Sequence, residues 1–178
     1  FGKLSYITFC HASVLRDLGP TMAPMNAFLT LTGIETLPLR MRQHNENAAK
    51  VAHFLRYHPA VTNVSWAGFS DSPYYDRAKK YLAFGAGSVF TFEVKEGYHA
   101  AKNLVENCNL FSHLANIGDT RSLIIHPAST IHRQLTDSQR EQAGIGAGTI
   151  RVSVGIESPS DIIADLQGAL EVASGKKI

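Results

Sequence analysis

Apolar positions follow a helical spacing in the first third of the chain. Phe28, Leu31, Ile34 and Leu37 recur every three residues, which predicts an amphipathic helix. Pro38 should kink or end that helix near Leu37, because proline removes a backbone donor and clashes with the preceding turn. A second helical stripe, closed by Pro59, contains Ala48, Val51, Ala52 and Leu55.

From residue 61 onward, strand-like and helix-like segments alternate. The alternating or continuous apolar runs predict strands at residues 61–66, 87–94, 110–115, 121–125 and 149–157. Helical spacing and turn residues predict helices at 72–82 (Ser72 as cap), 97–107, 137–144 and 158–173. In the last helix, Ser158 is the expected cap, and the buried stripe consists of Ile162, Ile163, Leu166, Ala169 and Leu170.

This order of segments predicts an α+β fold, in which leading helices precede a sheet with helices packed on one face. A boundary between two parts is expected between Pro38 and Asn47, which gives a helical segment at 1–45 and an α+β domain at 46–178.

Composition narrows the range of partners. The 178 residues are 44% hydrophobic and 18% charged, with 17 basic and 15 acidic side chains and a net charge of +2. No strong field favours nucleic acid or anionic lipid, so neither is an expected partner, and no apolar run reaches the roughly 20 residues of a membrane span. Two distant cysteines indicate a reducing, cytoplasmic setting. The chain opens mid-pattern without Met or signal-peptide features, which hints at a fragment, although initiator removal or trimming would look similar.

The strand at 149–157 carries a candidate binding residue. Ile150, Val152, Val154 and Ile156 alternate onto one face, and Arg151 and Ser153 point to the other. The planar guanidinium of arginine suits two-point binding of a carboxylate or phosphate. Spacing alone nevertheless favours an arginine that is solvated or salt-bridged.

The segment from Gly118 to His132 places polar residues on both sides of an apolar run. Ser122 precedes residues 123–125, and His126, Ser129 and Thr130 follow them. Hydroxyls beside a turn mostly bond backbone groups. The histidines match no metal-ligand spacing, so no metal site is predicted, and Cys108 is expected to be an inert, buried thiol. The residues alone thus predict an α+β domain with a candidate anion-binding arginine.

Four long segments carry a family resemblance. In chain order, these segments are "LRDLGPTMAPMNAFLTLTGIETLPLRMRQHNENAAKVAHFL", "YYDRAKKYL", "LFSHLANIGDTRSLIIHPASTIHRQL" and "IRVSVGIES". Together they resemble the C-terminal half of the pyridoxal-phosphate enzymes of cysteine and methionine metabolism. Within this family, "SHLANIGDTRSLIIHPAST" and "HRQL" are most similar to the O-acetylhomoserine sulfhydrylases. Cystathionine synthases and lyases usually have a Gly-Gly-x-Glu-Ser type of run where this chain has residues 119–122.

The resemblance implies a fold, an activity and a site. Residues 1–45 would be the tail of the cofactor domain, and residues 46–178 the small C-terminal domain of a fold-type I enzyme, with a mostly antiparallel sheet. Arg151 would bind the substrate's α-carboxylate, Ser122 would line the same site, and His126, Ser129 and Thr130 would form the rim of the cleft. The full enzyme would replace the acetate of O-acetylhomoserine by sulfide or a thiol, giving homocysteine or methionine.

The resemblance also bears on cofactor and partners. Family members hold pyridoxal phosphate covalently on a lysine, usually within a Ser-x-Thr-Lys run. None of the eight lysines follows such a run, so we expect no covalently bound cofactor, no catalytic or cofactor-binding residue and no activity in this chain alone. The implied partners are an amino-acid substrate, the missing N-terminal cofactor domain and further copies, as in the family's tetramers.

Two alternatives stay open. The first is another enzyme of the same family, a cystathionine γ-synthase or γ-lyase or a methionine γ-lyase. The second is of another class, a stand-alone, non-catalytic domain that binds a carboxylate ligand or assembles with a partner.

Overall fold

The computed structural model describes residues 2–175, and its contacts divide the chain into two units, up to Pro38 and from Leu39 onward. The first unit is helical, and none of its described residues is buried. Its elements are η1 (Gly2–Leu4), α1 (Ser5–Phe9), the π-helical η2 (Cys10–Leu18) and α2 (Pro24–Glu35). The assignment of residues 1–45 to a cofactor domain stays a prediction.

The predicted helix break near Pro38 is present, but it lies slightly earlier. α2 ends at Glu35, and α3 (Leu37–Tyr57) begins with Pro38 as its second residue. Proline is tolerated in the first turn of a helix, where its missing N–H has no intrahelical acceptor. Pro38 therefore starts the second helix instead of kinking the first.

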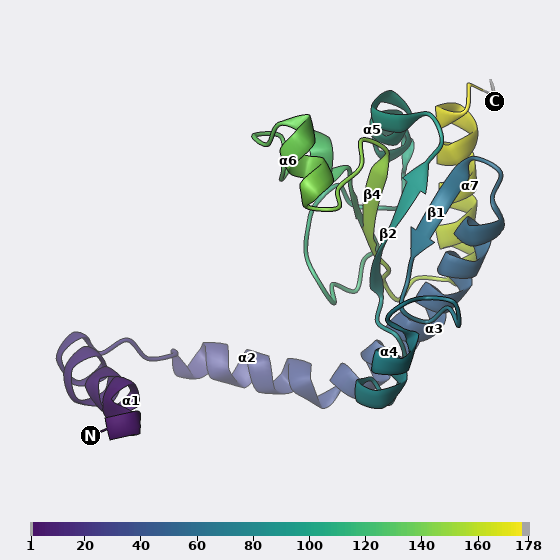
Figure 1. Ribbon diagram of the computed structural model, residues 1–178. Helices are drawn as coiled ribbons and strands as arrows, with labels where there is room; N and C mark the ends of the chain where they lie inside the picture. The colour runs from purple at the N-terminus through teal and green to yellow at the C-terminus, as the bar shows by residue number, and fades with distance from the viewer. Residues whose placement is uncertain (1, 176–178) are drawn as a thin grey trace. The chain divides into compact units, whose positions relative to one another are not determined.

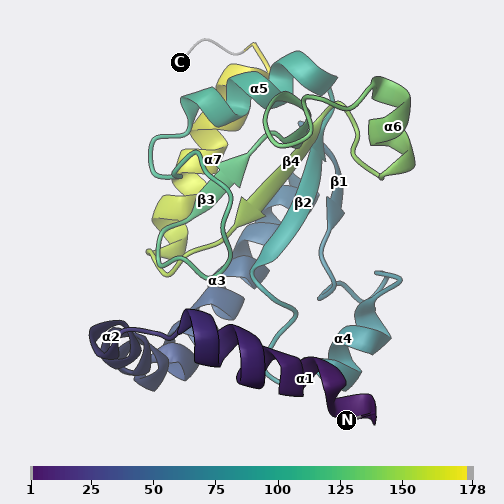
Figure 2. The same ribbon diagram turned by 90° about the vertical axis from the view of Figure 1, so that its left-hand side faces the viewer.

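The second unit is built on a four-stranded sheet in the order β1-β2-β4-β3, with antiparallel pairing between each pair of neighbouring strands. Figure 2 shows the sheet face-on, with α3 and α7 behind it. The predicted α+β fold, a mostly antiparallel sheet with helices on one face, is confirmed. The strands are β1 (Val61–Ser65), β2 (Val89–Val94), β3 (Leu123–Ile125) and β4 (Thr149–Ser153), and the remaining helices are α4 (Tyr75–Tyr81), α5 (Gly97–Asn107), η3 (Pro127–Ser129), α6 (Asp137–Gln142) and α7 (Pro159–Ala173).

The main core lies between the sheet and helices α3, α5 and α7 (Figure 1). The sheet contributes the alternate residues Phe90, Phe92 and Val94 of β2 and Ile150 and Val152 of β4, all of which are buried. The predicted stripe of α3 is buried in full, and that of α7 is buried except for Ile163, which is half-buried. Burying one such side chain contributes roughly 1.5–3 kcal/mol, so these stripes hold the helices on the sheet.

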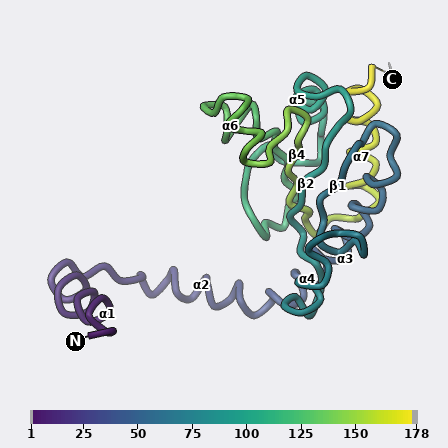
Figure 3. Tube along the Cα trace, viewed as in Figure 1, coloured from purple at the N-terminus to yellow at the C-terminus, as the bar shows by residue number. Residues whose placement is uncertain are grey.

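The opposite face of the sheet is covered in part by the α5–β3 loop and by α6, which lie across the sheet from α7 (Figures 1 and 3). Thr91, Arg151 and Ile125 are cross-strand neighbours and therefore share this face. Leu123 and Ile125 are buried there, at 1% and 3% exposure. Arg151 thus sits on a second, partly covered face and not on bare surface.

Two strand predictions were wrong in detail. Residues 110–115 form no strand; Ser112 makes one bridge to Leu123, and a turn from Leu114 N to Ser112 O follows at once. The strand predicted at 149–157 ends at Ser153; beyond it, Val154 N and Ile156 N still donate to the carbonyls of Ser88 and Thr120, in register with the two neighbouring strands, but the continuous ladder stops.

One predicted helix start and one predicted helix cap also differ. The helix expected from Ser72 begins at Tyr75, because a turn closed by Tyr75 N and Ser72 O comes first. Ser158 precedes α7 as expected, but its hydroxyl bonds the hydroxyl of Ser160 and no backbone N–H of the helix.

Candidate functional site: an arginine on the second face of the sheet

Arg151 lies in the middle of β4, which is flanked by β2 and β3. Its direct cross-strand neighbours are Thr91 and Ile125, both uncharged. The residue is half-buried. The three-strand ladder therefore fixes its backbone, while its long side chain extends over the second face.

The guanidinium of Arg151 is not neutralised by a carboxylate of the described residues. Its one hydrogen bond is long, from Nη2 to the carbonyl oxygen of Asn116 at 3.4 Å. Glu93 lies on the same face, two residues along β2 from Thr91, the cross-strand neighbour of Arg151. It accepts a hydrogen bond from the Thr149 hydroxyl at 3.2 Å and forms no ion pair with Arg151. A half-buried cation without an anionic partner suits the binding of an external anion.

A second polar group on this face lacks a partner. Ser153, two residues along β4 from Arg151, is 2% exposed, and its hydroxyl has no hydrogen bond among the described residues. Buried hydroxyls are normally satisfied, and exceptions call for an explanation such as a ligand or an ordered water. The face with Arg151 thus carries both an uncompensated charge and an unpaired hydroxyl.

Ser122 lies just before β3 and is fully buried. Its hydroxyl donates to Glu157 Oε2 at 2.9 Å and accepts from Gly155 N at 2.9 Å, while its amide donates to Glu157 Oε1 at 2.6 Å. Ile125 is the cross-strand neighbour of Arg151 and lies three residues after Ser122. Ser122 is therefore about 10 Å along the strand from the position opposite Arg151. The predicted contact of Ser122 with the substrate stays a prediction, and its hydroxyl proton is already committed to Glu157.

A buried polar network that the sequence did not reveal holds the exit of β4. From α3, His44 Nδ1 donates to Val154 O at 2.6 Å, and Asn47 Nδ2 donates to the carbonyls of Gly155 and Glu157 at 3.0 and 2.7 Å. Both side chains are 0% exposed. Their positions extend the apolar stripe of α3 at helical spacing, which is the signal that could have marked them as buried. Together with Ser122, they fix where the chain leaves β4.

His126, Ser129 and Thr130 are also brought together, through hydrogen bonds within their own segment. His126 is 1% exposed; its Nε2 donates to Ala147 O at 2.9 Å, and its Nδ1 bonds the Ser129 hydroxyl at 2.9 Å. The Thr130 hydroxyl donates to His126 O at 2.8 Å. These bonds join η3 to the start of β4, and the assignment of the three residues to a cleft rim stays a prediction.

We expect the stability of the chain to fall between pH 7 and pH 5 partly because of His126. Burial, helped by the positive charge of Arg140, holds the pKa of His126 below its usual value despite the bond to Ala147. As the pH falls through about 6.5, the unfolded chain gains the proton first, and the folded state loses stability. Urea unfolding at pH 7, 6 and 5 measures how steeply the free energy of unfolding falls with pH. His126→Gln should make this pH dependence shallower, and at pH 7 it should lower the free energy of unfolding by roughly 1–3 kcal/mol.

His132→Gln is the matched control for removing a histidine, and it should keep the pH dependence because the His126 hydrogen bonds remain. Equal pH dependence for the protein and for His126→Gln would show that His126 does not couple stability to pH.

The described lysines lie at the surface, and the potential metal ligands of the described chain form no cluster. The six lysines among residues 2–175 are all exposed, so none projects from the interior into a cavity. No group of three or more His, Cys, Asp or Glu side chains in this range is arranged to hold a metal ion. Burial raises the pKa of the Cys108 thiol to about 12, which agrees with the expected inert role.

The antiparallel sheet, the helices on its one face and the order of the segments place the chain in a known family of enzymes. Residues 5–171 match the family of Cys/Met metabolism PLP-dependent enzymes, and the chain is a member of that family. It is 47% identical over 170 residues to an O-acetyl-L-homoserine sulfhydrylase of Leptospira meyeri, which covers 95% of this chain and 38% of that protein. It is 44% identical over 188 residues to the homocysteine/cysteine synthase of Saccharomyces cerevisiae, with 99% and 42% covered.

Solved structures show the same relationship. One such structure is that of a Campylobacter jejuni protein described as an O-acetylhomoserine (thiol)-lyase, which carries a pyridoxyl-lysine. It superposes on this chain with a TM-score of 0.85 at 41% identity, and the match covers 96% of this chain and 41% of the other. The cystathionine gamma synthase of Xanthomonas oryzae gives a TM-score of 0.79 at 37% identity, over 90% and 41%. The chain therefore spans about two fifths of the length of these relatives. Within residues 2–175, no helix is both long and apolar enough to cross a membrane.

Proposed function

We propose that this chain is the C-terminal portion of a pyridoxal-phosphate-dependent O-acetylhomoserine sulfhydrylase and that Arg151 binds the substrate's α-carboxylate. The observation that carries the second part is the half-buried guanidinium of Arg151, which lies on a fixed strand without an anionic partner among the described residues. The relatives support the first part, since O-acetylhomoserine sulfhydrylases and homocysteine synthases are similar to this chain over nearly its whole length.

The role of this chain in the proposed reaction is binding and orientation. Two parallel N–H···O bonds from Arg151 to the carboxylate would fix both the position and the rotation of the substrate's α-carbon. The cofactor, held by the rest of the enzyme, supplies the electron sink for the bond changes. The network around Ser122 and Glu157 keeps the exit of β4, and therefore the strand that carries Arg151, in one place.

The apolar surface of the first unit agrees with a chain that is part of a larger protein. Phe28, Leu29, Leu31 and Ile34 of α2 are 54–63% exposed. Exposed apolar patches of this kind usually mark interfaces. We propose that the preceding part of the polypeptide, the cofactor domain, covers this row of side chains in the intact enzyme.

The proposal predicts the sulfur donor. The intact polypeptide, loaded with pyridoxal phosphate, should convert O-acetylhomoserine and sulfide into homocysteine and acetate at least tenfold faster than it converts O-acetylhomoserine and cysteine into cystathionine. Product analysis with each donor measures this ratio. A preference for cysteine would instead identify a cystathionine γ-synthase, the second candidate, which the similarity to the Xanthomonas oryzae enzyme supports.

The present chain alone, mixed with pyridoxal phosphate, should show no absorbance band of a Schiff base that borohydride reduces to a stable secondary amine on a lysine. Such a band would contradict the assignment of the cofactor lysine to the missing part.

A further inference from the structure

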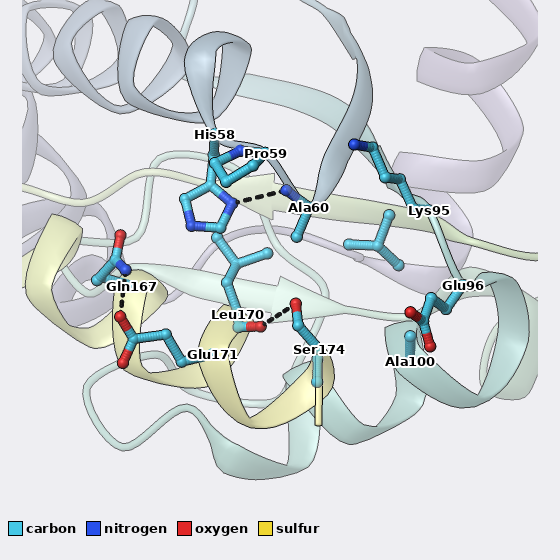
Figure 4. Close-up of a pocket in the computed structure, with 12 residues that line it drawn as sticks. His58, Pro59, Ala60, Lys95, Glu96, Ala100, Gln167, Leu170, Glu171 and Ser174 are labelled. Atoms are coloured by element: carbon cyan, nitrogen blue, oxygen red, sulfur yellow. Dashed lines mark hydrogen bonds between the residues drawn. The ribbon is translucent and has the colours of Figure 1, made fainter. Parts of the chain in front are cut away.

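A cavity of about 370 Å³ lies at one end of the core of the second unit, where three segments meet. These are the turn after α3, the turn between β2 and α5, and the last two turns of α7 (Figure 4). The floor is apolar, because Val94, Ala100 and Leu170 belong to the core and are 6%, 7% and 0% exposed. This volume lies within the range of small-molecule sites, roughly 300–1,000 Å³.

Two carboxylates border this apolar floor, and Figure 4 shows them on opposite sides of the cavity. Glu171 is half-buried, and Gln167 Nε2 donates to its Oε1 at 2.5 Å, which holds the carboxylate in place. Neither Glu171 nor Glu96 belongs to an ion pair of the described residues. The cavity thus combines an apolar floor with uncompensated negative charge.

Two helix ends add to this negative potential. α3 ends at Tyr57 and α7 at Ala173, and the residues that follow or form these ends line the cavity. The C-terminus of a helix carries a partial negative charge from its aligned peptide dipoles. Among residues 2–175, Lys95 is the one lysine or arginine that lines the cavity; it is exposed, and its amine extends toward Ala60 at the rim in Figure 4. Among the described lining residues, the two carboxylates outnumber this one ammonium.

We infer that this cavity binds a small organic cation, an ammonium group on a short apolar body. The ammonium would lie beside Glu171, where partial burial strengthens the attraction between opposite charges. The apolar body would cover Val94, Ala100 and Leu170. The inference is independent of the proposed function, since none of the residues that line the cavity contacts Arg151.

The test is a titration of this chain with n-butylammonium chloride at pH 7, followed by the amide NMR signals and matched with sodium chloride. We expect saturable shifts confined to residues 58–60, 94–100 and 167–174, with a dissociation constant on the order of 1–10 mM, as suits a ligand of five heavy atoms. n-Butanol and pentanoate, which carry the same butyl chain, should bind at least tenfold more weakly.

Matched variants separate charge from shape. Glu171→Gln keeps the size of the side chain and the acceptor for Gln167, and it should weaken butylammonium binding at least tenfold without changing the melting temperature. Glu106→Gln, which removes a carboxylate paired with Lys102 on the outer face of α5, should leave binding unchanged. Absence of saturation, equal binding of butanol, or unchanged binding to Glu171→Gln would each overturn the inference.

Discussion

Replacing Arg151 by alanine should lower kcat/KM for O-acetylhomoserine at least tenfold in the intact enzyme. Loss of a desolvated, charge-assisted pair typically costs about 2–5 kcal/mol, and each 1.4 kcal/mol corresponds to a factor of ten. Arg151→Lys should recover only part of the activity, because an ammonium cannot make two parallel bonds to a carboxylate. Steady-state kinetics of the three proteins, over a range of O-acetylhomoserine concentrations, measure both effects.

The fold should survive this substitution, because the guanidinium contributes a single long hydrogen bond to the described structure. Thermal unfolding of Arg151→Ala checks this point. Arg121→Ala is the matched control: Arg121 is 62% exposed and pairs with Asp119 at the surface, where ion pairs contribute little. Unfolding of Arg151→Ala, or an equal loss of activity in Arg121→Ala, would show that the effect is not specific to substrate binding by Arg151.

Replacing Gly155 by alanine should destabilise the second unit by at least about 3 kcal/mol, in the range of severe overpacking. A Cβ atom at this buried position would lie 2.5 Å from Arg121 C and from Ser122 N, and 2.3 Å from Glu157 Oε2. Two of these atoms belong to the backbone, so the start of β3 would have to move away from the exit of β4. The hydrogen bond between Gly155 N and the Ser122 hydroxyl would be lost with it.

Gly168→Ala provides the matched control for this substitution. Gly168 lies inside α7, and no atom lies within 4 Å of a Cβ added there. Because alanine favours helix more than glycine, this variant should be more stable by roughly 0.5–1 kcal/mol. Urea unfolding of this chain measures both variants. If Gly155→Ala were as stable as Gly168→Ala, the close approach of β3 and β4 at this glycine would be wrong.

Local periodicity was sufficient to predict the core. The buried faces of α3, β2 and α7 repeat every 3.6 or two residues, so their positions can be read without knowing the fold. The strand prediction for residues 110–115 was wrong because a short apolar run does not distinguish a strand from a turn that makes a single bridge to a strand. The end of β4 was predicted too late for a different reason, since Val154 and Ile156 continue the alternation and each still makes one backbone bond in register beyond the strand.

The site was predictable only in part. Alternation placed Arg151 opposite the core row, and the structure agrees, but its lack of a carboxylate partner depends on the loop at Asn116, 35 residues earlier in the chain. Glu157 was not recognised as the partner of Ser122, because the two residues are 35 positions apart and meet only when β3 and β4 pair. Non-local contacts of this kind leave no local pattern in a single sequence.

The most direct test of the role of Arg151 combines a change in the enzyme with a change in the substrate. The intact enzyme and its Arg151→Ala variant are each assayed with O-acetylhomoserine and with its α-carboxamide, and the four kcat/KM values form a double-mutant cycle. If Arg151 binds the carboxylate, the carboxamide should lower kcat/KM at least tenfold in the unmodified enzyme and have little further effect in the variant. If the two losses multiply independently, Arg151 does not contact the carboxylate, and the proposed site is wrong.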